Sequence, residues 1–291
     1  MQDWLAIGGG ALTARINPFG AELSSLTDAD GREWMTDADP AYWTGRSPLL
    51  FPIVGALNGG VYRHGGSEYA LAQHGFARRR AFAVIDHGGN HARFRLVDDA
   101  DSRAVYPFSF TLDAEYRIDG NALTIACTAA NTGDTPMPVS FGYHPAFAWP
   151  LPGNVDKQGH VIEFDQPEPA PLARVSGGLI AGHDRPSPLI GGNRLPLDDA
   201  LFVQDALVWD GPASRAVTYR SPGGASLRID YADADKLGIW TKPGSRFICI
   251  EPWWGIADPA GFTGEISQKP GIRILAPGEA RRFAMTITVF A

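Results

Sequence analysis

Apolar and polar residues alternate with a period of two in several separate stretches of the chain. In residues 108–116 every even position is apolar and every odd position is polar. Similar alternation occurs in residues 123–128, 227–231 and 283–289. A period of two is typical of strands that bury one face, as in antiparallel sheets.

Helical periodicity is nearly absent. No stretch keeps apolar residues at three-four spacing for more than about two turns before a glycine or proline interrupts it. The 34 glycines and 23 prolines punctuate the chain at short intervals, which suits many short strands. Residues 150–200 are the least regular part, and we expect long surface loops with a few strands there. The pattern predicts an all-β fold, a large and mostly antiparallel β-sandwich forming a single domain over residues 1–291.

Charge and composition exclude several classes of protein. The net charge is −7, and the only basic cluster is the arginine trio 78–80, which argues against a nucleic-acid partner. Residues 1–8 lack the basic head and long apolar stretch of a signal peptide, and no apolar run reaches membrane-spanning length. We therefore expect a cytoplasmic protein without a membrane partner, a monomer or weak dimer.

The two cysteines lie inside apolar strand patterns. The neighbours of Cys127 and Cys249 are mainly small or aliphatic residues. We interpret both as buried small side chains, because neither their number nor their spacing fits a disulfide framework or a zinc site. We expect no metal and no cofactor.

One carboxylate stands where a buried strand ends. Glu251 follows the apolar run 247–250, Pro252 comes next, and then Trp253 and Trp254. An acid at a strand end beside flat aromatic surface is typical of a sugar site with a base. The alternative is a strand-end carboxylate that points to solvent.

Two histidines are placed in a similar way. His74 is followed by Gly75, which permits a tight turn that exposes the imidazole. His144 ends an apolar strand and is followed by Pro145. Histidine titrates near neutral pH, so either residue is a candidate proton donor. Taken singly, each is more often structural.

Three further residues are candidates for contacts to a ligand. Asp205 falls inside the apolar segment 201–209, which we expect to be a strand, where an unpaired carboxylate would be costly. It therefore binds either a ligand hydroxyl or an internal cation. Arg46 and Arg78 flank other candidate segments and contact either a ligand or solvent.

Together these motifs resemble the aldose 1-epimerase (galactose mutarotase-like) family, and within it the LacX-like bacterial branch. That family folds as a large β-sandwich, in agreement with the pattern above. The segments that carry the resemblance are Leu-Phe-Pro-Ile-Val-Gly at 50–55, Gln-His-Gly-Phe-Ala-Arg at 73–78, Gly-Tyr-His-Pro-Ala-Phe at 142–147, Asp-Ala-Leu at 205–207 and Cys-Ile-Glu-Pro-Trp-Trp-Gly-Ile-Ala-Asp at 249–258.

The resemblance implies interconversion of the α and β anomers of a sugar by ring opening and closure. It makes Glu251 the general base and His144 the general acid. It places His74 and Asp205 in the sugar pocket. In the mechanism that follows from these roles, we expect Trp253 or Trp254 to stack on the sugar's apolar face. Which histidine donates the proton stays open.

The chain departs from the family at Ala56, where relatives usually carry an arginine. Either Arg46 or Arg78 substitutes for it, or the substrate lacks that contact. The sugar itself stays open among neutral, phosphorylated and acidic hexoses. Two other functions remain as alternatives: a glycoside hydrolase that uses Glu251 and Asp205, and a sugar-binding protein without catalysis.

Overall fold

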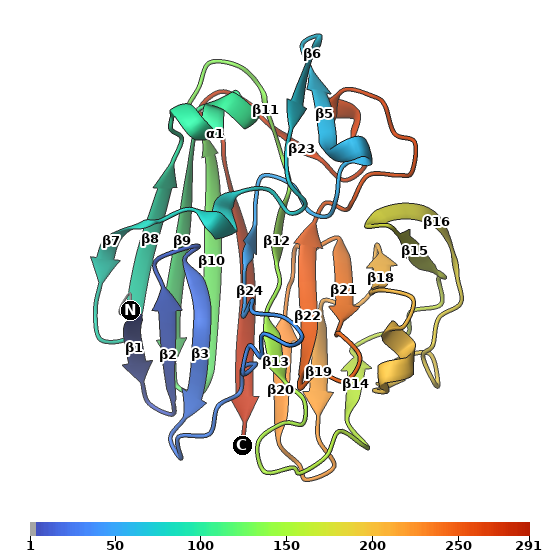
Figure 1. The fold of residues 1–291 in the computed structure, drawn as a ribbon. Coiled ribbons are helices and arrows are strands. Elements are labelled where there is room, and N and C mark those ends of the chain that lie inside the picture. Colours follow the sequence, from blue (N-terminus) through green and yellow to red (C-terminus); the bar gives the residue numbers. More distant parts are fainter. Residues whose placement is uncertain (1–3) are drawn as a thin grey trace.

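The computed structural model describes residues 4–291, so the first three residues of the N-terminal segment discussed above lie outside it. Two large antiparallel sheets form the molecule (Figure 1). The nine-stranded sheet has the order β17–β14–β19–β20–β24–β10–β9–β8–β7. Its strands are β7 (Ala83–His87), β8 (His91–Val97), β9 (Phe110–Asp119), β10 (Ala122–Asn131), β14 (Val161–Phe164), β17 (Arg194–Pro196), β19 (Ala216–Arg220), β20 (Ser226–Asp230) and β24 (Ala280–Phe290).

The second sheet has eight strands in the order β16–β15–β18–β21–β22–β12–β4, and β13 also pairs with β22. Its strands are β4 (Leu49–Leu50), β12 (Phe141–Tyr143), β13 (Ala146–Ala148), β15 (Leu172–Ser176), β16 (Leu179–Arg185), β18 (Leu207–Asp210), β21 (Lys236–Trp240) and β22 (Phe247–Trp254). This sheet carries the candidate site.

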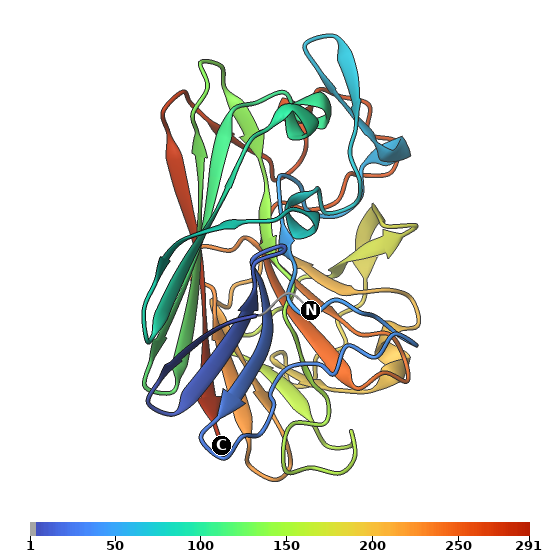
Figure 2. The same cartoon turned by 60° about the vertical axis from the view of Figure 1, so that its left-hand side comes forward.

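Smaller elements surround the two sheets. The β1–β3 sheet, dark blue in Figure 2, contacts β8, β9 and β10. Its strands and the remaining elements are β1 (Leu5–Gly9), β2 (Leu12–Asn17), β3 (Glu22–Asp28), the hairpin β5 (Val61–His64) and β6 (Ser67–Ala70), the pair β11 (Met137–Val139) and β23 (Arg273–Leu275), the helix α1 (Ala100–Val105), and the 3₁₀ helices η1 (Asn58–Gly60), η2 (Ala77–Arg79), η3 (Asp199–Phe202) and η4 (Ile266–Gln268). No helix within residues 4–291 is long and apolar enough to cross a membrane.

The core lies between the two large sheets and is rich in aromatic residues. Phe141 of β12 stacks on Phe283 of β24 with ring centroids 5.0 Å apart. The Tyr143 hydroxyl lies 2.8 Å from the Phe283 carbonyl oxygen and accepts the Cys127 amide at 3.2 Å. These contacts join β12 of one sheet to β10 and β24 of the other, so the strand that leads to His144 is fixed by the core.

The prediction of an all-β, mostly antiparallel sandwich is confirmed. The four alternating segments lie in β9, β10, β20 and β24. Residues 150–200 form long connections with the short strands β14 to β17. Both cysteines are buried and unbridged, as expected.

Candidate active site

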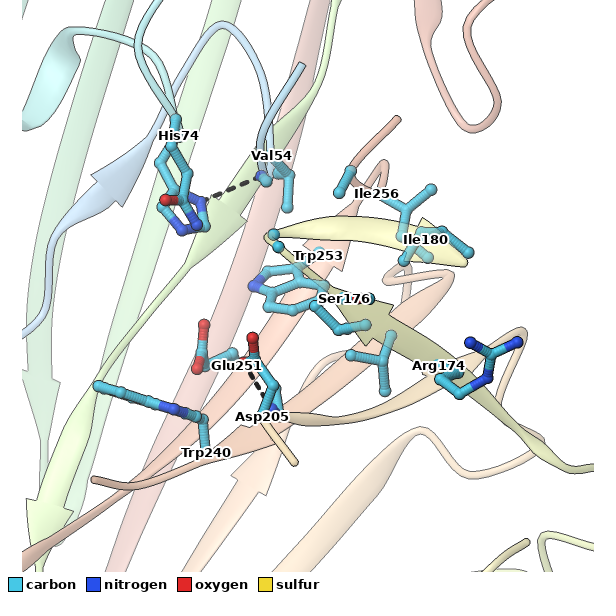
Figure 3. A pocket seen from close by; sticks show the side chains of 18 of the residues that line it. Val54, His74, Arg174, Ser176, Ile180, Asp205, Trp240, Glu251, Trp253 and Ile256 are labelled. Atoms are coloured by element: carbon cyan, nitrogen blue, oxygen red, sulfur yellow. Dashed lines mark hydrogen bonds between the residues drawn. The ribbon is translucent and has the colours of Figure 1, made fainter. Parts of the chain in front are cut away.

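Strand β22 continues past Glu251 and Pro252 to Trp254, so the expectation that a buried strand ends at Glu251 is wrong. The strand presents two different faces because its side chains alternate. Ile248, Ile250 and Trp254 belong to the core between the sheets. Glu251 and Trp253, at the alternate positions, line a cavity of about 880 Å³ on the outer face of the same sheet (Figure 3). The turn around His74, the β15–β16 hairpin and the loop 203–206 complete its walls.

Glu251 and His144 meet at the base of this cavity. The Glu251 Oε2 atom lies 3.2 Å from His144 Nε2, and both side chains are at least nine-tenths buried. Among the described residues, Oε2 of Glu251 and Nδ1 of His144 have no hydrogen-bond partner. No other side chain of the described structure hydrogen-bonds to these two atoms, so the contact between Glu251 and His144 stands by itself.

A break between two short strands brings the pair together. β12 pairs with β22 at Trp253 and Trp254, and β13 pairs with it at residues 247–249. His144 and Pro145 occupy the gap between β12 and β13, opposite Glu251. The Pro145 carbonyl still accepts the Ile250 amide at 3.2 Å, which fixes the gap on β22.

Burial perturbs both groups toward their neutral forms. It raises the pKa of Glu251 well above its usual value, and the Asp205 carboxylate acts in the same direction. Burial also lowers the pKa of His144 to about 3, and the charge of Arg78 adds to this effect. The pair therefore carries one proton near neutral pH: His144 does not take up a second proton, and Glu251 does not release the one it holds.

His74 is held in one tautomer by the neighbouring loop. Its Nδ1 accepts the Gly55 amide at 3.1 Å, and its own amide donates to the Gly55 carbonyl at 2.9 Å. Because Nδ1 accepts, the neutral ring carries its proton on Nε2. Burial lowers the pKa of His74 well below its usual value, with His144 and Arg78 contributing. His74 thus offers a hydrogen-bond donor. Both His74 and Gly75 have positive φ (66° and 70°), so the expected tight turn is present.

Aromatic rings form the floor and one side of the cavity. The Trp253 indole extends over Gly142 of β12 and Gly238 of β21, where added Cβ atoms would come within 2.6 Å and 2.5 Å of it. Only glycine leaves room for the ring to lie across both strands. Trp43 and Trp240 stand beside His144, with ring centroids 4.9 Å and 6.0 Å from the imidazole.

Asp205 lines the cavity, but the expectation that it lies in a strand is wrong. β18 begins at Leu207, and the preceding apolar residues form η3 and a turn. Asp205 is exposed, has a φ of 75°, and its Oδ1 accepts the Ala206 amide at 2.7 Å. The carboxylate is therefore hydrated and needs no internal cation to offset burial.

Two predicted sugar contacts lie elsewhere. The Arg46 guanidinium donates to the Thr36 carbonyl at 2.7 Å and to two other carbonyls, and so ties β3 to the loop that follows it. Trp254 is fully buried and packs on Phe283 in the core, because it is one residue out of phase with Trp253. Neither side chain lines the cavity, so both predictions are corrected.

Arg78 is the candidate that replaces the arginine absent at Ala56. It lines the cavity, donates to the Gln73 carbonyl at 2.8 Å, and its Nε atom is buried without a partner in the described structure. At Ala56 itself, the tip of the β15–β16 hairpin lies close, since a Cβ on Gly178 would be 3.3 Å from the Ala56 Cβ. A longer side chain at Ala56 would have to displace this tip.

Trp43, Arg174 and Arg185 are among the cavity-lining residues that the sequence reasoning missed. Trp43 lies in a loop without a strand pattern, and Arg174 and Arg185 lie in the irregular region that was expected to be surface loop. The sequence around these residues carries no pattern that marks a site. Residue type alone does not distinguish Arg174 and Arg185 from arginines on the surface. The Arg174 guanidinium pairs with Asp184.

Possible metal ligands also meet here. Ligand atoms of His144, Cys249 and Glu251 lie within 4.8 Å of one another. Burial raises the pKa of both Cys249 and Glu251 well above the usual values, whereas metal binding requires the deprotonated forms. A metal bound here would therefore have to displace protons from both side chains.

Comparisons with known proteins identify the family of this chain. A family model for aldose 1-epimerase matches residues 4–288. The chain is 31% identical over 288 residues to the chromosomal Protein LacX of Lactococcus lactis, with 96% of each protein covered.

Two solved structures share the fold closely. A galactose mutarotase related enzyme from Lactobacillus acidophilus has 29% identity and a TM-score of 0.93, covering 99% of this chain and 97% of the other. A galactose mutarotase-like protein from Lactobacillus casei has 29% identity and a TM-score of 0.91, covering 99% and 100%. The match of the family model over almost the whole sequence establishes that this chain belongs to the aldose 1-epimerase family.

Proposed function

We propose that this protein is a mutarotase that interconverts the α and β anomers of an aldohexose or a derivative of one. The observation that carries the proposal is the buried contact of 3.2 Å between Glu251 and His144 at the base of an aromatic-walled cavity. Membership of the aldose 1-epimerase family supports it.

In the proposed mechanism Glu251 takes the proton of the anomeric hydroxyl while His144 gives a proton to the ring oxygen. The bond between C1 and the ring oxygen breaks, and C1 becomes a free aldehyde. Rotation about C1–C2 presents the other face of the carbonyl. Closure by the reverse proton transfers gives the other anomer.

The pair holds the same number of protons before and after ring opening. It starts as carboxylate and imidazolium and ends as carboxylic acid and neutral imidazole. Burial favours a single proton on the pair and places it on Glu251, since it raises the pKa of Glu251 and lowers that of His144. That proton must therefore pass from Glu251 to His144 across their 3.2 Å contact before ring opening. The site is therefore ready for the next turnover without exchanging a proton with solvent.

The other cavity residues suit the binding of a sugar. The Nε2–H of His74 is a donor for a sugar oxygen, and the carboxylate of Asp205 is an acceptor for hydroxyls. Trp253 offers a flat surface for the apolar face of the ring. Arg78 takes the place of the arginine that relatives carry at the position of Ala56.

The first experiment follows optical rotation, or anomer exchange by NMR, of freshly dissolved α-D-glucose and α-D-galactose with the protein and with Glu251→Gln. Faster equilibration that the variant lacks supports the proposal. Release of reducing sugar from an aryl glycoside would favour the hydrolase alternative. Sugar binding without anomer exchange would favour a non-catalytic binding protein.

A further inference from the structure

Arg185, at the end of β16, hydrogen-bonds to the main chain of the turn that contains Asp205. Its guanidinium donates to the carbonyl of Leu201 at 2.8 Å and to that of Ala206 at 2.9 Å. Two longer contacts of 3.4 Å reach the carbonyls of Gln204 and Asp205. One side chain therefore binds four main-chain oxygens between residues 201 and 206, using the forked donor geometry that only arginine has.

The conformation of the 201–206 turn requires stabilising contacts. Asp205 has a φ of 75°, in the left-handed region that non-glycine residues seldom occupy. Val203, Gln204 and Asp205 are all exposed, so burial contributes little to holding this segment. The local hydrogen bond from the Ala206 amide to Asp205 Oδ1 is a contact that favours this conformation.

The guanidinium of Arg185 binds the main chain of Asp205 and makes no hydrogen bond to its carboxylate. All four acceptors of Arg185 are carbonyl oxygens. The Asp205 carboxylate lines the same cavity as Glu251 (Figure 3). A direct ion pair would instead occupy the oxygens that a sugar hydroxyl needs.

We propose that Arg185 is a positioning residue for substrate binding, which acts by fixing the 201–206 turn so that Asp205 faces the sugar. This inference rests on the proposed function, in which Asp205 accepts sugar hydroxyls. Arg185 lies on the hairpin β15–β16 and Asp205 before β18, so the contact also joins two walls of the cavity.

The test compares Arg185→Met and Arg185→Lys with Arg194→Met as the control. Arg194 is an exposed arginine on β17 that pairs with Glu163. Kinetic constants are measured on whichever hexose the wild type equilibrates, and amide hydrogen exchange is measured over residues 201–206. We expect Arg185→Met to raise KM about tenfold, equal to about 1.4 kcal/mol, with kcat within about twofold. Amides in the turn exchange faster, and the control changes neither readout.

A double-mutant cycle separates positioning from general stability. In an Asp205→Gly background, which removes the carboxylate and tolerates the φ of 75°, Arg185→Met should change KM by less than about twofold, because the group it positions is gone. The same factor in both backgrounds, or an unchanged KM with only a lower melting temperature, overturns the inference. If Arg185→Met does not fold, Arg185→Lys decides, since a single ammonium cannot span the carbonyls of Leu201 and Ala206. A wild-type KM for that variant overturns the inference.

Failure of the proposed function gives a different result. In that case the wild type equilibrates no hexose, and sugar affinity is read instead from the fluorescence of the cavity tryptophans. The exchange rates of residues 201–206 need no substrate at all. Unchanged exchange in both Arg185 variants contradicts the inference whether or not the protein is an enzyme.

Discussion

Replacing Glu251 with glutamine removes the proposed base and keeps the size of the side chain. A positioned acid or base typically contributes about 10²–10⁴-fold to rate, so we expect kcat to fall by about that factor. KM should change little, because His74, Asp205 and Trp253 still line the cavity. The result would separate the chemistry at Glu251 from sugar binding.

The same substitution should not weaken the fold. Burial raises the pKa of Glu251 above its unfolded value, so protonation favours the folded state. That contribution is complete below the unfolded pKa and is lost as the pH rises through the folded pKa, at about 1.4 kcal/mol for each pH unit between the two pKa values. Glutamine cannot ionise and avoids the loss. We therefore expect the variant to be more stable than the wild type at pH 7, with an advantage that grows as the pH rises toward the folded pKa of Glu251.

Polarimetry gives the rate and thermal unfolding at pH 6, 7 and 8 gives the stability. A variant with a rate within about fivefold of the wild type would refute the role of Glu251 as base. A melting temperature well below that of the wild type at all three pH values would refute the electrostatic argument, because it would mean that the ionised carboxylate stabilises the fold.

Three further outcomes are expected. His144→Asn should lower kcat by about 10²–10⁴-fold in the same polarimetric assay; if His74→Asn is the more damaging change, the two histidines have exchanged roles. Burial lowers the pKa of His144 to about 3 and raises that of Glu251, so kcat/KM should stay flat across the pH range in which an ordinary histidine titrates; a narrow bell centred in that range would contradict this. Trp254→Ala should cost about 3–5 kcal/mol in urea unfolding, since the ring is fully buried in the core; a small loss of stability with a raised KM would place Trp254 in the sugar site instead.

Much of the fold and part of the site could be predicted from the sequence, because side-chain parity along a strand is a local property. The alternating segments mark β9, β10, β20 and β24 without reference to anything distant. The same parity places Glu251 and Trp253 on one face of β22. The same alternation places Trp254 on the opposite face. Applying it strictly to residues 251–254 would have avoided the incorrect assignment of Trp254 to the sugar site.

Residues in the irregular segments were harder to place. Arg46 and Arg78 are both arginines beside apolar runs, yet one binds carbonyls of the β3 region and the other lines the cavity. The apolar residues before Leu207 gave the appearance of a strand around Asp205 but form a 3₁₀ helix and a turn. Local composition does not distinguish these cases, since the partners lie far away in the sequence.

The sequence by itself determined which residues alternate and singled out an acid and two histidines. It placed all three at strand ends, which is correct for His144 after β12 but wrong for Glu251, which lies inside β22, and for His74, which lies in a turn. Only the tertiary structure decided that His144 reaches Glu251, because the gap between β12 and β13 lies opposite Glu251 only when both strands pair with β22. The structure also decided the proton balance of the pair. A pKa change caused by burial depends on what covers the group, and that is settled only when distant strands pack together.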